Sequence, residues 1–267
     1  MKKISLFPIL LAGVFITSCH KDDDYHYEKP GGGGQNNVTE LKAAGDSSAI
    51  IGTINQFRKI LGDSLNVAPG KTSGRREVNW DGVPANLTNN NNFPLDFFNL
   101  TDPVGANGRK RGLVYLATSS PLRLDSSSFK DIDGSYASQF IPFSQKKAII
   151  SANSTVSEIV FKVAGTNTDA SVQGFGIIFS DVDEANSTTL QFFNGNKDLG
   201  TYKAQPKNGS ANFSFLGVHF QNDKVTRIKI TAGNGVLAAG TKDVSNGGNK
   251  DLVVYDDFFY DEPKPLQ

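Results

Sequence analysis

The chain has 267 residues, of which 27 are basic, 27 are acidic and one is a cysteine. This length suits one large β domain or two small ones, and the 19 phenylalanines supply enough apolar side chain for a packed core. A formal net charge of zero argues against a nucleic-acid-binding protein, because neutralising phosphates requires a basic face. A single cysteine excludes an internal disulfide and a cysteine-ligated metal cluster.

Residues 1–18 have the pattern of a bacterial signal peptide. Lys2 and Lys3 precede an apolar stretch, Ile4–Ile16, that is too short to predict a membrane span. The stretch ends in Ile16-Thr17-Ser18-Cys19, which resembles the lipobox, in which the cysteine takes a diacylglyceryl group before the peptide is cut in front of it. The alternative is an ordinary secretory signal with a chance cysteine. We therefore predict a lipid anchor at Cys19 that attaches the protein to a membrane.

Residues 19–45 are predicted to form a flexible, lipidated tether. Asp22-Asp23-Asp24 closely follows Cys19 and resembles the signal that sends lipoproteins of Bacteroidetes-type bacteria to the outer face of the outer membrane. The alternative is that this acidic run is merely solvated. The glycine-rich segment 30–37 is flexible by composition. Together these features predict an outer-membrane lipoprotein that is exposed on the cell surface.

One amphipathic helix is predicted at the start of the folded part, which we expect to be a single domain over residues 46–263. Asp46 offers an N-cap, and Gly62 is a typical stop signal. Between them, apolar residues recur at steps of four, three and four, as on one face of a helix: Ile50, Ile54, Phe57 and Leu61. We expect this face to dock on a sheet.

From about residue 76 onward, short apolar runs separated by turn residues predict antiparallel strands. Asn194-Gly195 favours a hairpin between 190–193 and 199–202. No segment of helical period interrupts residues 156–260, which argues against a parallel βαβ architecture. We predict a mainly β fold, an antiparallel β-sandwich or jelly roll, with residues 264–267 as a tail. The expected strands are 76–82, 112–118, 138–150, 157–164, 172–182, 188–194, 198–204, 211–221, 224–232 and 251–260.

Three motifs resemble those of a group of secreted, largely uncharacterised bacterial proteins. They are the opening SGRREVNWDGV (73–83), the central GFGIIFSDVD (174–183) and the closing VVYDDFFY (253–260). Asp261 follows the closing motif where the group usually has glycine. The resemblance covers about residues 47–263 and implies one continuous β-sandwich domain without an established activity. The closing motif is also similar, at the level of the fold, to galactose-binding-like jelly rolls, several of which hold a structural calcium.

Carboxylates at two of these motifs predict a calcium site. Asp181 and Asp183 come at the end of an expected strand, and Asp256 and Asp257 interrupt an otherwise apolar one. Because a buried carboxylate is costly without compensation, we expect Ca²⁺ to be bound by Asp181, Asp183 and one of the other two. Two alternatives stay open. The carboxylates cap turns and pair with arginines (Arg75, Arg76 or Arg227), or they form a catalytic pair.

Trp80, the only tryptophan, is a candidate ligand-binding residue. Strand alternation places it on the same face as Arg76 and Val78. Its indole ring has the shape to stack on a sugar, and the alternative is that it packs in the core. A lone tryptophan in a strand is more often part of the core than a binding platform.

The sequence contains no recognisable catalytic constellation. His219 is the only histidine outside the tether, no cysteine follows Cys19, and no Gly-x-Ser-x-Gly motif occurs. We therefore predict a non-enzymatic protein that binds carbohydrate or another extracellular polymer, or that mediates adhesion. The alternatives are a polysaccharide hydrolase that uses aspartate carboxylates and a purely structural envelope lipoprotein.

The lipid anchor leads to the first prediction. We expect the mature protein to fractionate with membranes and its N-terminal peptide to carry about two or three acyl chains, because one chain gives only marginal membrane binding. Mass spectrometry of that peptide measures the modification. An unmodified Cys19 in a protein recovered from the soluble cell interior would contradict the prediction.

Overall fold

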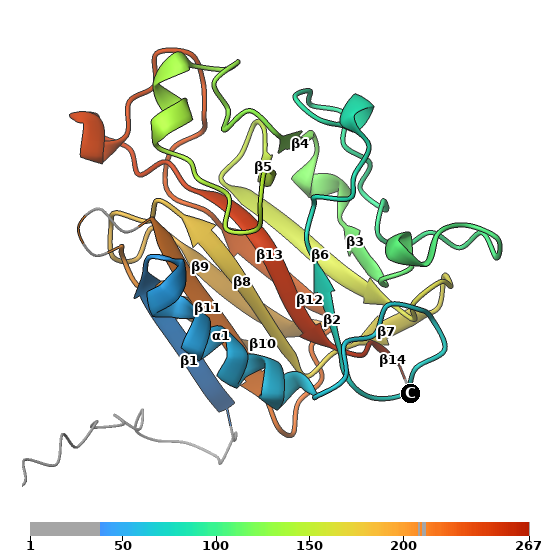
Figure 1. Ribbon diagram of the computed structural model, residues 1–267. Coiled ribbons are helices and arrows are strands. Elements are labelled where there is room, and N and C mark those ends of the chain that lie inside the picture. The colour runs from blue at the N-terminus through green and yellow to red at the C-terminus, as the bar shows by residue number, and fades with distance from the viewer. Residues whose placement is uncertain (1–37, 208, 210–211, 267) are drawn as a thin grey trace, which may run out of the picture. The chain divides into compact units, whose positions relative to one another are not determined.

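The computed structural model describes residues 38–207, 209 and 212–266, all of which belong to one compact unit of the chain, Asn36–Gln267. Two antiparallel sheets of seven strands each pack together in this unit and confirm the predicted β-sandwich class. Figure 1 shows how the sheets are arranged. Cys19, the signal peptide and the tether up to residue 37 lie outside the described residues. Within the described part, no helix has the length and apolarity needed to cross a membrane.

The first sheet has the order β1-β11-β8-β13-β5-β4, with β2 also paired to β13. The second has the order β10-β9-β12-β6-β7-β14, with β3 also paired to β6. The strands of the first sheet are β1 Val38–Gly45, β2 Arg75–Val78, β4 Leu122–Asp125, β5 Ala148–Ser151, β8 Gly174–Ser180, β11 Phe213–Phe220 and β13 Val254–Asp261. Those of the second are β3 Leu113–Tyr115, β6 Val156–Lys162, β7 Asp169–Ser171, β9 Thr189–Asn194, β10 Lys197–Lys203, β12 Arg227–Thr231 and β14 Lys264–Pro265.

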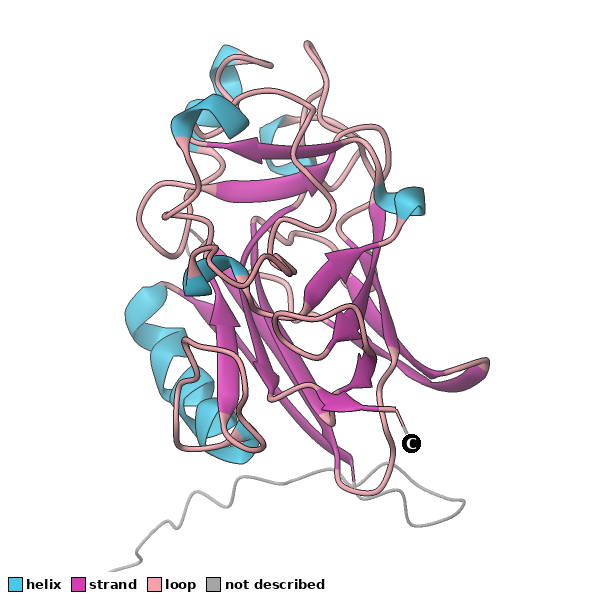
Figure 2. Ribbon diagram, turned by 90° about the vertical axis from the view of Figure 1, so that its right-hand side faces the viewer, coloured by secondary structure: helices cyan, strands magenta, loops and turns pink. Residues whose placement is uncertain are grey.

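The predicted helix is confirmed as α1, Ser47–Leu61. The side chain of Asp46 accepts a hydrogen bond from the backbone N–H of Ala49 at 2.8 Å and so caps the helix. The apolar stripe is buried as expected, and α1 lies on the outer face of the first sheet against β1, β11 and β13, as Figures 1 and 2 show. Glycines on the sheet make this close contact possible, since a Cβ at Gly176 would lie 2.7 Å from the Phe57 ring.

Trp80 is part of the core between the two sheets and has no exposed surface. Its ring makes edge-to-face contacts with Phe93, Phe98 and Phe258, at centroid distances of 6.0, 5.3 and 5.4 Å. The prediction that Trp80 binds a ligand is therefore wrong, because aromatic side chains cover the ring that would have to stack on a sugar.

The opening and closing motifs lie side by side, because β2 pairs with β13. A buried ion pair joins β2 to the residue that follows β13: Arg76 Nη2 lies 2.7 Å from Glu262 Oε1, and both side chains are almost fully buried. The other Glu262 oxygen accepts a hydrogen bond from Asn66 at 2.8 Å. Since each charge is matched by a partner, this pair can be held inside the protein.

Several predicted boundaries differ from the structure. Residues 38–45 were expected to belong to the tether, but they form β1, which pairs with β11 along its whole length. Lys264–Pro265, expected in the tail, pairs with β7 as β14. Short polar or alanine-rich runs such as these become strands only because a long-range partner supplies hydrogen bonds.

The expected strand 138–150 is mostly irregular, and only Ala148–Ser151 pairs as β5. A short 3₁₀ helix, η4 (Gly134–Ser138), precedes it, and Gln145 adopts a positive φ of 35°. Pro142 lies between η4 and β5 and has no backbone N–H to donate to a hydrogen bond between strands. The expected strand 76–82 likewise ends at Val78.

Docking of α1 leads to the second prediction. Phe57→Ala should lower the free energy of unfolding by about 3–5 kcal/mol, because it leaves a cavity between the helix and the sheet. Urea unfolding measures the change. The matched control is Ile51→Ala on the exposed face of the same helix, which should change stability by about 0.5 kcal/mol or less. Equal effects of the two variants would contradict the observed docking.

Candidate functional site

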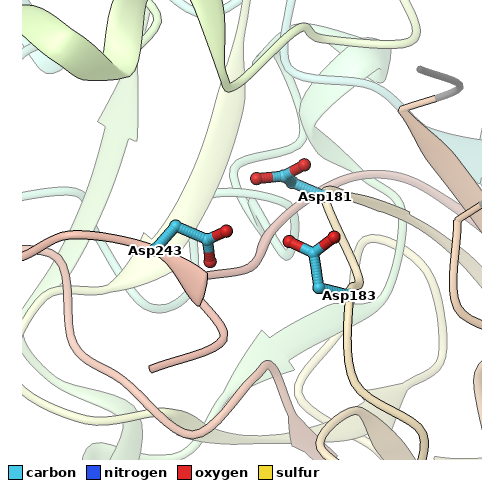
Figure 3. A group of neighbouring side chains, drawn as sticks. All are labelled: Asp181, Asp183 and Asp243. Carbon is cyan, nitrogen blue, oxygen red and sulfur yellow. The ribbon is translucent and has the colours of Figure 1, made fainter. Parts of the chain in front are cut away.

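Three aspartates meet at the end of the sandwich where β8 ends, at the upper left of Figure 1. Asp181 and Asp183 directly follow β8, and Asp181 has a left-handed backbone with φ of 72° that turns the chain out of the sheet. The third, Asp243, precedes a 3₁₀ turn, η5 (Val244–Asn246), in the connection from β12 to β13. Each aspartate offers one oxygen atom, and these atoms lie within 4.8 Å of one another. Figure 3 shows the three carboxylates gathered in one place.

Lys207 forms ion pairs with two of these carboxylates. Its ammonium contacts Asp181 Oδ1 and lies 3.1 Å from Asp183 Oδ1. Its backbone N–H donates to the carbonyl of Val182 at 2.7 Å, which anchors the lysine beside the two aspartates. The second oxygen of Asp181 accepts a hydrogen bond from Gln139 Nε2 at 2.7 Å. Every oxygen of this deeply buried carboxylate is therefore satisfied.

The arginines suggested as partners of these aspartates bind glutamates instead. Arg75 pairs with Glu77, Arg76 with Glu262, and Arg227 with Glu158. Ion pairing of the aspartates was among the open alternatives, and the structure assigns that role to Lys207. A Ca²⁺ ion bound here would have to displace the lysine ammonium, so calcium at Asp181 and Asp183 stays a prediction.

The pKa values of Asp183 and Asp243 are shifted in opposite directions. Burial, together with the contact with Asp243 and the negative charge of Asp181, raises the pKa of Asp183 to about 7. Burial acts on Asp243 in the same direction, but hydrogen bonds from Asp183, Leu252 and Ser245 hold its pKa below the usual value. A proton shared by the pair therefore resides on Asp183, and Asp243 stays ionised.

Asp251 fixes the turn that carries these residues. Its carboxylate accepts hydrogen bonds from the backbone N–H groups of Asp183 and Glu184, at 3.1 and 3.0 Å, and from the Ser187 hydroxyl. Asp243, Asp251 and Lys207 were all missed at the sequence level. Nothing in their spacing marks them, because they lie on different connections that meet only in the folded chain.

A small open hollow, which we call the polar hollow, adjoins this group. Its volume is about 150 Å³. All of its lining residues have polar side chains: Ser138, Gln139, Asp181, Lys207, Asn212, Ser245 and Asn246. They come from four connections at this end of the sandwich, so the sheets act as a scaffold and the loops make the surface.

Asp256 and Asp257 are not part of this group, so the prediction that one of them completes a site with Asp181 and Asp183 is wrong. The pairing of β13 with β8 shifts register between Tyr255 and Phe258, and the two aspartates occupy this bulge. Both bind Ser144: its N–H donates to Asp256 at 2.9 Å and its hydroxyl to Asp257 at 2.7 Å.

No basic side chain of the described residues forms an ion pair with Asp256 or Asp257. Burial raises the pKa of Asp257 to about 6 and that of Asp256 well above its usual value, and the charge of Asp257 raises the latter further. The two adjacent carboxyl groups therefore hold a proton between them near neutral pH. The shared proton thus offsets the cost of burying these two carboxylates, a role for which the sequence had suggested a cation.

No protein-family model, no curated protein and no solved structure matches the chain. The resemblance of its three motifs to a group of secreted bacterial proteins therefore stays a prediction, and the function has to be argued from the site.

The buried pair leads to the third prediction. Because the pKa of Asp257 is higher in the folded than in the unfolded chain, its contribution is most favourable below about pH 4 and is lost as the pH rises through about 6. Asp257→Asn removes this titration. When the pH is raised from 4 to 8, the difference in unfolding free energy between Asp257→Asn and the original chain should therefore shift by about 1–3 kcal/mol in favour of the variant. Urea unfolding at both pH values measures the gain.

The control is Asp63→Asn, an exposed carboxylate on the loop after α1. It should show no such dependence on pH. A gain of the same size in both variants, or none in Asp257→Asn, would contradict a buried proton at the bulge.

Proposed function

We propose that the protein is a non-enzymatic lipoprotein of the outer cell surface that binds a sugar unit of an extracellular polysaccharide in the polar hollow. The observation that carries this proposal is the lining of the hollow, in which every residue has a polar side chain. Pockets for apolar ligands are lined mainly by hydrophobic and aromatic side chains. A carbohydrate, with hydroxyl groups that both donate and accept hydrogen bonds, matches this lining better.

The hollow has both fixed and free groups. Asp181 holds the amide of Gln139 and the ammonium of Lys207, so these side chains are already oriented. Asn212 has no side-chain hydrogen bond to the described residues, and Asn246 has only a long one, of 3.4 Å, to Gln139. Their amides are therefore available to a ligand. A preorganised rim with free amides reduces the ordering cost of binding.

The arrangement favours binding over hydrolysis. Hydrolysis of a glycosidic bond uses two carboxyl groups on either side of the bond, roughly 5 to 10 Å apart. Here Asp183 and Asp243 contact each other, and neither lines the hollow. Asp181 does line it, but Lys207 and Gln139 engage its oxygens. A polysaccharide hydrolase and a purely structural envelope protein are the alternatives that the experiment must distinguish.

The fourth prediction tests binding. The detergent-solubilised lipoprotein should bind a subset of a glycan array, and Asn246→Ala or Asn212→Ala should weaken that binding by about tenfold, since a hydrogen bond contributes about 0.5–1.5 kcal/mol. Titration calorimetry on an array hit measures the loss. The matched control is Asn86→Ala, an exposed asparagine in the 3₁₀ helix η1 (Ala85–Leu87), which should bind as the original chain does.

An array without hits would contradict the proposal and favour a structural role. Release of new reducing ends from a bound polysaccharide, abolished by Asp181→Asn without a fall in melting temperature, would support the hydrolase instead.

A further inference from the structure

Lys207 differs from the other ion-paired lysines of the described residues in the burial of its partner. The side chain of Asp181 is 2% exposed and that of Lys207 is 13% exposed. The carboxylates that pair with Lys42, Lys162 and Lys197 are 31%, 69% and 15% exposed. The contact between Lys207 and Asp181 is thus the one lysine–carboxylate pair of the described residues that is largely withdrawn from water.

Backbone hydrogen bonds hold both partners in place. The N–H of Lys207 donates to Val182 at 2.7 Å, and the N–H of Asp181 donates to Asn212 at 2.8 Å. The segments that carry Asp181 and Lys207 are therefore joined by backbone hydrogen bonds next to the side-chain contact. Reacting groups that are fixed in contact have effective molarities of about 10⁵–10⁸ M, which favours bond formation between them.

The surroundings contain the other groups that an acyl transfer requires. Asp183 Oδ1 lies 3.1 Å from Lys207 Nζ and, in its ionised form, accepts a proton from the amine. Gln139 Nε2 donates to Asp181 Oδ2 at 2.7 Å, where it stabilises negative charge on the oxygen that stays. Asp181 and Lys207 both line the polar hollow, which gives a released water molecule a way out.

We propose that Lys207 and Asp181 condense into an intramolecular amide bond. One proton of the Lys207 ammonium passes to Oδ1 of Asp181, which gives an amine and a carboxylic acid, and Nζ attacks Cγ of Asp181 to form the C–N bond. The nitrogen then loses a second proton to Asp183, which passes it on to Oδ1. The Cγ–Oδ1 bond breaks, and Oδ1 leaves as water with these two protons. One amine and one carboxylic acid give one amide and one water, so the step needs no oxidant or further reactant.

The bond closes a covalent loop from residue 181 to residue 207 that contains the β9–β10 hairpin. It links the end of β8 to the segment that leads into β11, its neighbour in the first sheet. In a chain with a single cysteine, it supplies a cross-link that no disulfide can. The proposal does not depend on what the polar hollow binds.

The fifth prediction is read from the mass of tryptic peptides of the purified full-length lipoprotein. Trypsin should release peptide 163–197 joined to peptide 204–224, because the modified Lys207 is no longer cleaved. The joined species should weigh one water molecule less than the sum of the two peptides, and fragmentation should place the link between residues 181 and 207. Recovery of only free peptides 163–197, 204–207 and 208–224 would overturn the proposal.

Two variants test the roles of Lys207 and Asp183 in this reaction. Lys207→Arg keeps the positive charge beside Asp181 but lacks a nucleophilic amine, so it should give only the free peptides. Asp183→Asn should slow the appearance of the joined peptides at least tenfold in a time course after synthesis. Joined peptides in Lys207→Arg would place the link elsewhere and overturn the assignment, and an unchanged rate in Asp183→Asn would overturn the role of Asp183.

Discussion

Buried carboxylates at the ends and the bulge of two central strands impose the main constraint on this protein. β8 and β13 lie next to each other in the first sheet, and each brings acidic side chains into the interior. An ionised carboxylate out of water is costly unless it is paired or hydrogen-bonded. The connections that surround these strands are arranged so that each carboxylate has its own compensation.

Four kinds of compensation occur. Lys207 neutralises Asp181, Arg76 neutralises Glu262, and a shared proton serves Asp256 and Asp257. Asp261 accepts two backbone N–H groups, from Gln173 and Gly174, at 2.8 and 2.7 Å, although burial still raises its pKa to about 6. The two ion pairs tie the end of β8 to Lys207 and the end of β13 to β2, and the hydrogen bonds of Asp261 tie β13 to the start of β8.

The candidate site is a consequence of this arrangement. The loops that neutralise Asp181 and orient Asp183 are the same loops that line the polar hollow. A rigid sandwich below and hydrogen-bonded turns above give an open surface with oriented amides, an ammonium and a buried carboxylate. Such a surface suits recognition of a polar ligand, and the enforced contact between Lys207 and Asp181 is the basis for the proposed amide bond.

Local patterns were enough to predict the sandwich class, the helix with its capping residue, and the hairpin at Asn194-Gly195, because each of these depends on neighbours in sequence. They also predicted that the carboxylates of two motifs would need compensation. The burial of Trp80, the pairing of β1, and the gathering of Lys207 and Asp243 around Asp181 depended on contacts between distant residues. A bulge in β13 then sent Asp256 and Asp257 to Ser144 instead, since one unpaired residue redirects every side chain that follows it on the strand.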